Sequence, residues 1–345
     1  MNVLYHLTVL PPKLPQAEAL SQEIDALRSH FSGEIVHLNP NRRATGPIPR
    51  LLFGFQRLAD LRRREADIHL HHIYNPDPFP FPVLRLLRRP VVYTISSGWA
   101  GQRLNRAFFN RLAAVTAPDA RSVRHLRAAG LTNVHLVRPG VDVVRFTHTP
   151  PPPLDRLRLL AASAPWTEEQ FASKGVDALL EAARREPRLE LVFLWRGVLT
   201  EAMQGRVRRL GLADRVTVID RLVDVNQVLA RVHAVVCLAS RPGIVKSYPH
   251  SLLDGLAAGR PVLVSQAIPM ADYVAETGCG QVVEAVTPEA ILDATARLRG
   301  AYTIRQQAAQ AVGRRDFDQA RMVADYREVY LRATASRGRD AGWRE

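Results

Sequence analysis

Lysine is nearly absent from this chain of 345 residues, although the formal net charge is +14. Only Lys13, Lys174 and Lys246 are lysines, and every other one of the 47 basic residues is an arginine. A compact ammonium group is not interchangeable with a planar guanidinium group, so a lysine in an arginine-rich chain is informative. We therefore treat the three lysines as candidate functional positions.

Cysteine and long apolar runs are also scarce. Two cysteines, Cys237 and Cys279, give no disulfide framework, which favours a cytoplasmic location. No apolar run approaches the ~18 residues that a membrane span needs. The first twelve residues have no basic region ahead of their apolar residues and predict a first strand, not a signal peptide.

Length and pattern indicate an α/β protein with two domains. The chain suits about two domains of ~150 residues. Strand-like apolar runs alternate with amphipathic helical patterns in both halves, which indicates parallel sheets with helices on both faces. Four consecutive prolines at 150–153 predict a stiff extended linker. We place the first domain at 1–149, the linker at 150–153 and the second domain at 154–314.

The stretch 241–265 predicts a loop, a helix, a tight stop and a buried strand. Pro249 suits the first helical position, where its missing N–H costs nothing. Gly259 supplies the C-terminal stop, and Pro261 prevents the helix from continuing. The apolar run 262–264 then suits a strand that is covered on both faces.

The first turn of this helix is a candidate anion site. Its N–H groups at His250 and Ser251 have no acceptor within the helix. His250 and Asp254 are four residues apart and share one helix face. A nucleotide fits this pattern, with its diphosphate on the N–H groups and its ribose hydroxyls on Asp254.

Three stretches resemble the retaining glycosyltransferases of family 4. DGLAAGRPV at 254–262 resembles the second half of their signature, in which two glutamates separated by seven residues end in E-A-x-A-x-G-x-P-V, and the first glutamate falls on Lys246. KGVDALLEA at 174–182 resembles their K-G-x-x-x-L-L-x-A, and residues 138–146 resemble the P-N-G-V-D…R-F that closes their first domain. The alternative is the ordinary helix–turn–strand of any α/β protein.

The resemblance implies the fold and the reaction. The fold is GT-B, an α/β architecture of two facing Rossmann-like domains with parallel sheets and the active cleft between them. A C-terminal helix at 315–335 crosses back to the first domain, and a tail follows at 336–345. The reaction is metal-independent transfer of a hexose-like sugar, with retention, from a UDP- or GDP-sugar to a glycan, lipid-linked or other envelope acceptor. No cofactor is implied beyond that donor substrate.

The resemblance also assigns donor-binding residues. Lys174 neutralises the diphosphate together with the turn from Pro249 to Leu252, and Asp254 binds ribose. Arg221 and Leu222 stand where family members hold the base through backbone groups. The arginine that usually assists the lysine is missing from 164–166, so Arg196 or Lys246 supplies that charge.

The sugar site departs from the family pattern at two positions. Ser96 replaces a histidine that lies over the donor sugar, and a hydroxyl cannot replace an imidazole in acid–base work. Lys246 replaces an acid that contacts sugar hydroxyls, so it either pairs with a carboxylate on the donor, such as that of a uronic acid, or turns outward. Ser97 and Trp99 are candidate acceptor contacts. Lys13 is either a third acceptor contact or a solvated loop lysine.

These departures keep a second class of function open, a catalytically degenerate nucleotide- or sugar-binding protein or a partner subunit.

The basic segment 50–64 predicts an amphipathic helix that either lies on an anionic membrane, at its inner face, or buries its apolar stripe in the core. Only charge argues for nucleic acid, and we do not expect that partner. His69 and His71 alternate onto one strand face, where no further cluster completes a metal site, so we expect structural histidines.

Overall fold

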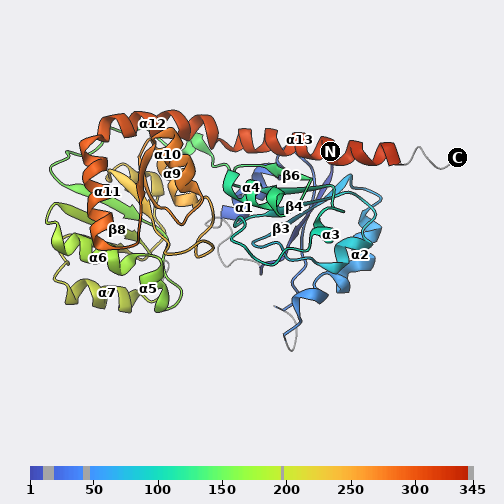
Figure 1. Cartoon of the computed structure of the whole chain (residues 1–345), viewed down its shortest axis with the longest axis horizontal. Coiled ribbons are helices and arrows are strands. Elements are labelled where there is room, and N and C mark those ends of the chain that lie inside the picture. Colours follow the sequence, from blue (N-terminus) through green and yellow to red (C-terminus); the bar gives the residue numbers. More distant parts are fainter. Residues whose placement is uncertain (11–18, 42–46, 196–197, 341–345) are drawn as a thin grey trace. The chain divides into compact units, whose positions relative to one another are not determined.

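The computed structural model describes residues 1–10, 19–41, 47–195 and 198–340, with side chains to residue 335. It divides into two compact units (Figure 1). Unit 1 comprises Met1–Pro139 with Gln319–Glu345, and unit 2 comprises Gly140–Asp318. Each unit contains a six-stranded parallel sheet with helices, so the α/β prediction is confirmed.

The sheet of unit 1 has the strand order β2-β1-β3-β4-β5-β6. The order reverses between β1 and β3, and this is the position at which open α/β sheets bind ligands beyond their carboxyl ends. The strands are β1 (Val3–Leu7), β2 (Ile35–His37), β3 (Leu70–Asn75), β4 (Val91–Ile95), β5 (Ala114–Ala117) and β6 (Val134–Leu136).

Helices cover both faces of this sheet. One hydrophobic cluster joins it to α1 (Ala19–Arg28) and to α13 (Gln319–Asp340), the last helix of the chain. A second cluster joins the other face to α2 (Leu58–Arg64), α3 (Arg106–Phe109) and α4 (Ala120–Ala128). Among the helices that the structure describes, none is both long and apolar enough to cross a membrane.

The continuous helix predicted over 50–64 is wrong. Two 3-10 turns, η2 (Arg50–Leu52) and η3 (Phe55–Arg57), precede the short helix α2. Gly54 separates the two turns with φ +88°, a left-handed conformation that glycine tolerates and that ends a right-handed helix. A Cβ at this position would also lie only 2.9 Å from the Val83 side chain.

The sheet of unit 2 has the strand order β12-β11-β10-β7-β8-β9 and reverses between β7 and β10. Its strands are short and apolar, and successive residues contribute to clusters on opposite faces. They are β7 (Leu157–Ala161), β8 (Leu189–Leu194), β9 (Val216–Ile219), β10 (Ala234–Cys237), β11 (Val262–Ser265) and β12 (Gly280–Val283).

The helices of unit 2 divide between the two faces. The face with the first cluster is covered by α8 (Val225–Leu229), α9 (His250–Ala257), α10 (Met270–Thr277) and α12 (Tyr302–Asp316). The other face is covered by α5 (Glu169–Ser173), α6 (Val176–Arg185), α7 (Thr200–Arg209) and α11 (Pro288–Gly300). The helix and strand predicted within 241–265 are present as α9 and β11.

The proline run packs against unit 2 through a buried arginine. Arg260 has no exposed surface. Its guanidinium donates to the Leu229 carbonyl at 2.9 Å, to the Thr149 hydroxyl at 2.7 Å and to the Pro150 carbonyl at 3.4 Å. His233 lies 3.1 Å from the Pro152 carbonyl through its Nε2. These bonds hold the run on the surface of one unit, and the division between units falls earlier, at Gly140.

Candidate active site

The candidate site of unit 2 lies beyond the carboxyl ends of β7 and β10, where the strand order reverses. Lys174 ends α5 as its C-cap residue and is only 8% exposed. Its ammonium donates a hydrogen bond of 2.8 Å to the carbonyl oxygen of Ala164, in the loop after β7. The Ser240 N–H, after β10, donates to the Ser173 carbonyl at 2.8 Å. Lys174 is therefore held between the loops of the two neighbouring strands.

Steric crowding explains why a glycine, Gly175, follows this lysine. Gly175 has φ +70° and begins α6 as its N-cap residue. A Cβ there would lie 2.8 Å from the side chains of both Leu238 and Val286. Burial raises the pKa of the Cys237 thiol at the end of β10 to about 12, and the charge of Lys174 acts in the opposite direction. The Lys174 ammonium is therefore close enough to the end of β10 to act electrostatically on the Cys237 thiol.

Helix α9 begins next to this point. Pro249 is its N-cap residue, with ψ 124°, so the prediction of Pro249 as the first helical residue is wrong by one position. The N–H groups of Leu252 and Leu253 donate to the Pro249 carbonyl at 2.9 and 3.3 Å. His250 and Ser251 open the first turn, where helix dipole and N–H groups favour an anion.

Asp254 lies one turn further along α9 and is partly buried. Burial raises the pKa of its carboxyl to about 6, and His250 and Arg145 act against that rise. No hydrogen bond to this carboxylate is present among the residues that the structure describes. A carboxylate that is desolvated but accepts no hydrogen bond from these described residues suits a ligand that brings hydroxyl donors.

Lys246 lies half-buried in the loop between β10 and α9. Its neighbours Ile244 and Val245 pack against the core cluster of unit 2, which holds the loop in place. Within the described ranges, the Lys246 ammonium makes no hydrogen bond or ion pair. The loop therefore presents a cation four residues before the start of α9.

The remaining predicted donor residues follow β8 and β9. Arg221 and Leu222 are exposed after β9, with Leu222 71% exposed. β9 is two strands from β7, or roughly 10 Å at the usual spacing. Arg196 falls outside the described residues. Trp166 stands where the family pattern has an arginine, and it is 62% exposed. Its backbone N–H donates a hydrogen bond to the Gln170 side chain.

The predicted residues of unit 1 follow β4. Ser96 is partly buried, and its N–H donates to the Asn75 carbonyl at 2.8 Å. Ser97 N–H donates to the Pro76 carbonyl at 3.3 Å. Trp99 packs against the core, and its indole N–H donates to the Gln102 carbonyl at 2.9 Å, so only its ring is left for a ligand. Lys13 falls outside the described residues.

Comparisons with known proteins show the family of this chain and its fold. The family model described as Glycosyltransferase Family 4 matches residues 5–145, and the model described as Glycosyl transferases group 1 matches residues 169–311. The chain belongs to the GT-B glycosyltransferases of family 4. No curated protein matches the sequence.

Solved structures share the fold of this glycosyltransferase at low sequence identity. HepE of Anabaena, in complex with UDP, has a TM-score of 0.70 and 14% identity over 95% of this chain and 99% of its own. A glycosyltransferase from Rickettsia africae has a TM-score of 0.74 and 9% identity over 96% and 98%. WaaG, a glycosyltransferase involved in lipopolysaccharide biosynthesis, has a TM-score of 0.61 and 15% identity over 97% and 98%.

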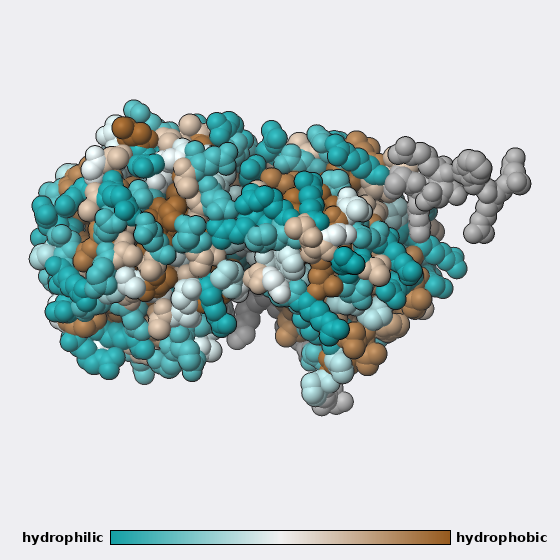
Figure 2. Space-filling view, viewed as in Figure 1, coloured by the Kyte–Doolittle hydropathy of each residue, from teal (hydrophilic) through white to brown (hydrophobic). Residues whose placement is uncertain are grey.

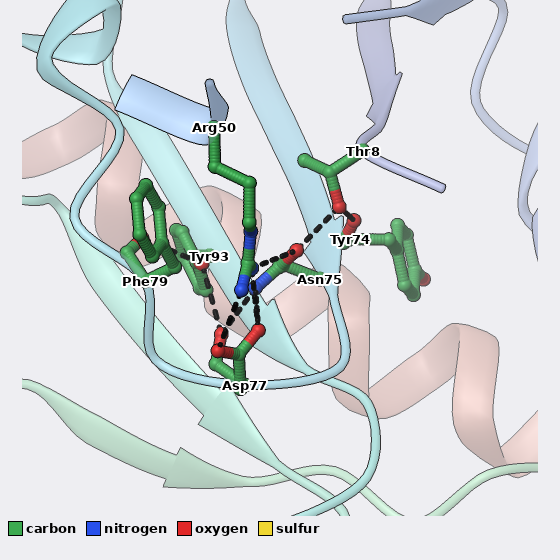
Figure 3. A network of polar contacts seen from close by, with 7 residues as sticks. All are labelled: Thr8, Arg50, Tyr74, Asn75, Asp77, Phe79 and Tyr93. Carbon is green, nitrogen blue, oxygen red and sulfur yellow. Dashed lines mark hydrogen bonds and ion pairs between the residues drawn. The ribbon is translucent and has the colours of Figure 1, made fainter. Parts of the chain in front are cut away.

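A polar network at the carboxyl edge of unit 1 was not predicted (Figure 3). Arg50 forms a two-point ion pair with Asp77, at 2.6 and 3.1 Å, and its guanidinium lies 4.2 Å from the centre of the Phe79 ring. Asn75, at the end of β3, accepts from the Thr8 hydroxyl after β1 and donates to Asp77. The network joins the ends of β1 and β3 and orders the loop after β3 in this glycosyltransferase.

Two arginines have roles that the sequence pattern does not predict, Arg145 beside Asp254 in unit 2 and Arg50 in the polar network of unit 1. Arg145 lies in the motif-like stretch 138–146, and its charge opposes the rise that burial causes in the pKa of Asp254. Arg50 was counted only as part of a basic segment. Neither can be distinguished in the sequence from the many other arginines, because only their folded partners single them out.

Proposed function

We propose that this glycosyltransferase transfers a sugar, with retention, from a nucleotide-diphosphate sugar to a glycan, lipid-linked or other envelope acceptor. One observation carries the proposal. At the reversal point of the unit 2 sheet, a buried ammonium, a helix N-terminus and a carboxylate that accepts no hydrogen bond from the described residues lie beyond the ends of two adjacent strands. This set matches the diphosphate and the ribose of a nucleotide.

The diphosphate is the leaving group and gains negative charge as the glycosidic bond breaks. Lys174 supplies positive charge for it, and the first turn of α9 supplies the N–H donors of His250 and Ser251. The Leu252 N–H already donates to the Pro249 carbonyl at 2.9 Å, so Leu252 belongs to the turn without being a donor to the diphosphate. The leaving phosphate accepts the proton of the attacking hydroxyl on the same sugar face. The fixed cation and the helix dipole neutralise the leaving diphosphate, which is the role of a metal ion in metal-dependent transferases. We therefore propose metal-independent transfer.

The nucleoside is oriented by the rest of the set. Asp254 accepts hydrogen bonds from the ribose hydroxyls. Burial raises the pKa of this carboxyl and makes its charged form costly, which favours a ligand that brings such donors. Arg221 and Leu222 receive the base. HepE binds UDP, which makes a UDP-sugar the first donor to test, with GDP-sugars second.

The sugar contacts are Lys246 and Ser96. Because Lys246 has no described partner, we propose that it pairs with a carboxylate on the transferred sugar. Ser97 and Trp99 are proposed acceptor contacts, and WaaG's role in lipopolysaccharide biosynthesis makes envelope glycans the first acceptors to test.

An exposed apolar and basic surface of unit 1 fits an anionic membrane that carries such an acceptor. Four large apolar side chains, at Leu51, Leu52, Phe55 and Leu86, are 38–55% exposed. The Arg62 guanidinium donates to the Leu86 carbonyl at 3.0 Å and joins the two segments. Figure 2 shows hydrophobic side chains gathered over the part of unit 1 where Figure 1 places α2. We name these four residues the apolar patch.

Arginines surround the apolar patch. Arg62, Arg63, Arg85, Arg88 and Arg89 are exposed in the same two segments, and Arg57 is half-buried. Among these described residues, only the Arg63 guanidinium forms an ion pair with a carboxylate. Apolar side chains that enter the headgroup region and arginines that contact lipid phosphates together give reversible membrane binding. The proposed location is the inner face of a cytoplasmic membrane.

Calorimetric titration with UDP, GDP, ADP and their sugar conjugates tests the donor, followed by transfer to envelope glycans with the anomeric configuration read by NMR. Binding of one nucleotide and a product of retained configuration support the proposal. Two departures from the family pattern favour a second function, that of a nucleotide- or sugar-binding protein or a partner subunit. Ser96 stands in place of the family histidine, and Lys246 stands in place of the family acid. Nucleotide binding without hydrolysis or transfer of any sugar would favour that alternative.

A further inference from the structure

Unit 1 contains a basic site at the edge of its sheet, beside the edge strand β6. A cavity of about 260 Å³ is bounded by α4, the edge strand β6 and α13. Its charged lining residues are Arg127, Arg138, Arg321, Asp325, Glu328 and Arg332. All of them belong to unit 1, whereas Lys174, α9 and Asp254 belong to unit 2.

The lining carries a surplus of positive charge. Four guanidinium groups face two carboxylates, so the net charge of the lining is +2. Arg321 pairs with Asp325 at 3.1 Å, and Arg332 pairs with Glu328 at 3.5 Å, each one helical turn apart on α13. Both arginines are about two-thirds exposed, at 66 and 68%. Such exposed pairs are weak and yield readily to a stronger anionic partner.

The other two arginines approach from different elements. Arg127 lies in the last turn of α4, and its guanidinium donates to the Val134 carbonyl at 2.9 Å, which holds it over the edge strand. Arg138 follows β6 and is half-buried. Guanidinium groups that converge from α4, β6 and α13 suit a ligand whose several oxygens accept paired hydrogen bonds.

We propose that this cavity binds a phosphate-bearing ligand and thereby connects α4, β6 and α13. The volume is below the 300–1,000 Å³ that is usual for drug-sized ligands, and it suits a phosphate or diphosphate group. The ligand is a free phosphorylated molecule or the phosphate of a lipid headgroup. The site is independent of the donor site.

The test uses His135, which also lines the cavity. Burial lowers the pKa of this imidazole, and the nearby Arg332 and Arg127 lower it further. The facing groups are Arg127 on α4, Arg138 after β6, and Arg321, Asp325, Glu328 and Arg332 on α13. A bound anion neutralises the arginines, so titration of the full chain with inorganic diphosphate should raise the pKa of His135, measured by NMR of its ring proton.

Two double variants with equal changes in charge isolate the site. Arg127→Gln with Arg332→Gln removes two lining arginines and should weaken diphosphate binding at His135 at least tenfold. Arg124→Gln with Arg327→Gln changes the same two helices outside the lining and should leave it unchanged. The proposal is overturned if 10 mM diphosphate does not move the His135 resonance, or if both double variants bind like the unchanged chain.

Vesicles distinguish the two sources of phosphate. The unchanged chain and both double variants are floated with phosphatidylglycerol vesicles and with phosphatidylcholine vesicles. Loss of phosphatidylglycerol binding in the Arg127/Arg332 variant alone assigns the site to lipid phosphate. Equal flotation of all three proteins, with diphosphate binding lost in that variant, assigns it to a free phosphorylated ligand.

Discussion

The imidazole of His72 and the phenol of Tyr330 lie 2.6 Å apart, although 258 residues separate them in the chain. The other ring nitrogen of His72 lies 2.7 Å from the Thr94 hydroxyl. Tyr326, one turn before Tyr330, also reaches Thr94, at 3.0 Å. These fully enclosed bonds attach the last helix, α13, to β3 and β4 in the middle of the unit 1 sheet.

This attachment predicts that unit 1 loses stability in acid. Burial lowers the pKa of His72 to about 3, against ~6.5 in an unfolded chain. Below pH 6.5 the unfolded chain takes up a proton that the folded chain refuses until about pH 3, so the free energy of unfolding falls as the pH falls through this window. The loss from His72 alone is at most about 5 kcal/mol.

Urea unfolding at pH 7 and pH 4.5 checks this for the unchanged chain and for His72→Asn. The variant should be less stable at pH 7, because two buried hydrogen bonds change, and should depend less on pH. His6 and His71 also have pKa values lowered mainly by burial, so some pH dependence should remain. The exposed substitution His30→Asn is the control. An undiminished pH dependence in His72→Asn would contradict the assignment.

Lys174→Met should reduce kcat/KM by roughly 100-fold, the usual cost of one electrostatic contact to a charge that develops during the reaction. It should also weaken nucleotide binding, because the ammonium is proposed to contact the diphosphate before the bond breaks. Arg185→Met is the matched control, since this exposed arginine on α6 pairs with Glu181 and Glu289 on the surface. Unaltered nucleotide affinity in a folded Lys174→Met protein would refute the donor role.

Asp254→Asn should make the protein more stable and bind nucleotide less tightly. Because burial raises the pKa of Asp254 to about 6, the folded chain between pH 4 and 6 keeps a proton that the unfolded chain has lost. The free energy of unfolding therefore falls as the pH rises through this window, by about 3 kcal/mol in full. The variant escapes this loss, so its advantage should be present at pH 8 and absent at pH 4.

Nucleotide affinity supplies the second measurement on Asp254→Asn. A neutral amide accepts weaker hydrogen bonds from ribose than a carboxylate does, so the affinity at pH 8 should fall about tenfold or more. The affinity of the unchanged chain should fall below pH 6, whereas that of the variant should stay flat in this range. Gained stability without lost affinity would place the ribose elsewhere.

Lys246→Glu should change the sugar that is transferred. If the ammonium pairs with a carboxylate on the donor, the unchanged enzyme prefers a nucleotide-linked uronic acid and the variant prefers the corresponding neutral hexose. Competition between the two donors in one reaction measures the ratio of their kcat/KM values, with Lys246→Gln as the uncharged control. An unchanged ratio in both variants would sink the hypothesis and leave Lys246 as a solvated cation.

Leu52→Asp with Phe55→Asp should weaken binding to vesicles that contain anionic lipid. Each change replaces an exposed apolar side chain of the apolar patch with a charge of the same sign as the membrane. Val144→Asp with Ile304→Asp is the matched control, because these two apolar side chains of unit 2 are 89 and 69% exposed. Flotation with phosphatidylglycerol vesicles reads the outcome, and equal loss in both proteins would argue for nonspecific charge attraction.

Much of the fold follows from local chemistry. The alternation of short apolar runs with amphipathic helical patterns predicts the two parallel sheets, because period and element length depend on neighbours in the sequence. The same holds for α9 and β11, whose proline and glycine signals lie within a few residues. The prediction over 50–64 was wrong because one glycine, Gly54, takes a left-handed conformation against Val83.

The sequence by itself determined the fold class, the family and the candidate residues Lys174 and Asp254, because motif spacing and residue type are local properties. Tertiary structure alone decided that Arg260 is buried against the proline run, that Arg50 pairs with Asp77, and that α13 is held through His72. In a chain whose basic residues are nearly all arginine, composition does not distinguish a buried guanidinium from a solvated one. Partners distant in the sequence make that distinction, and they meet only when the sheets have formed.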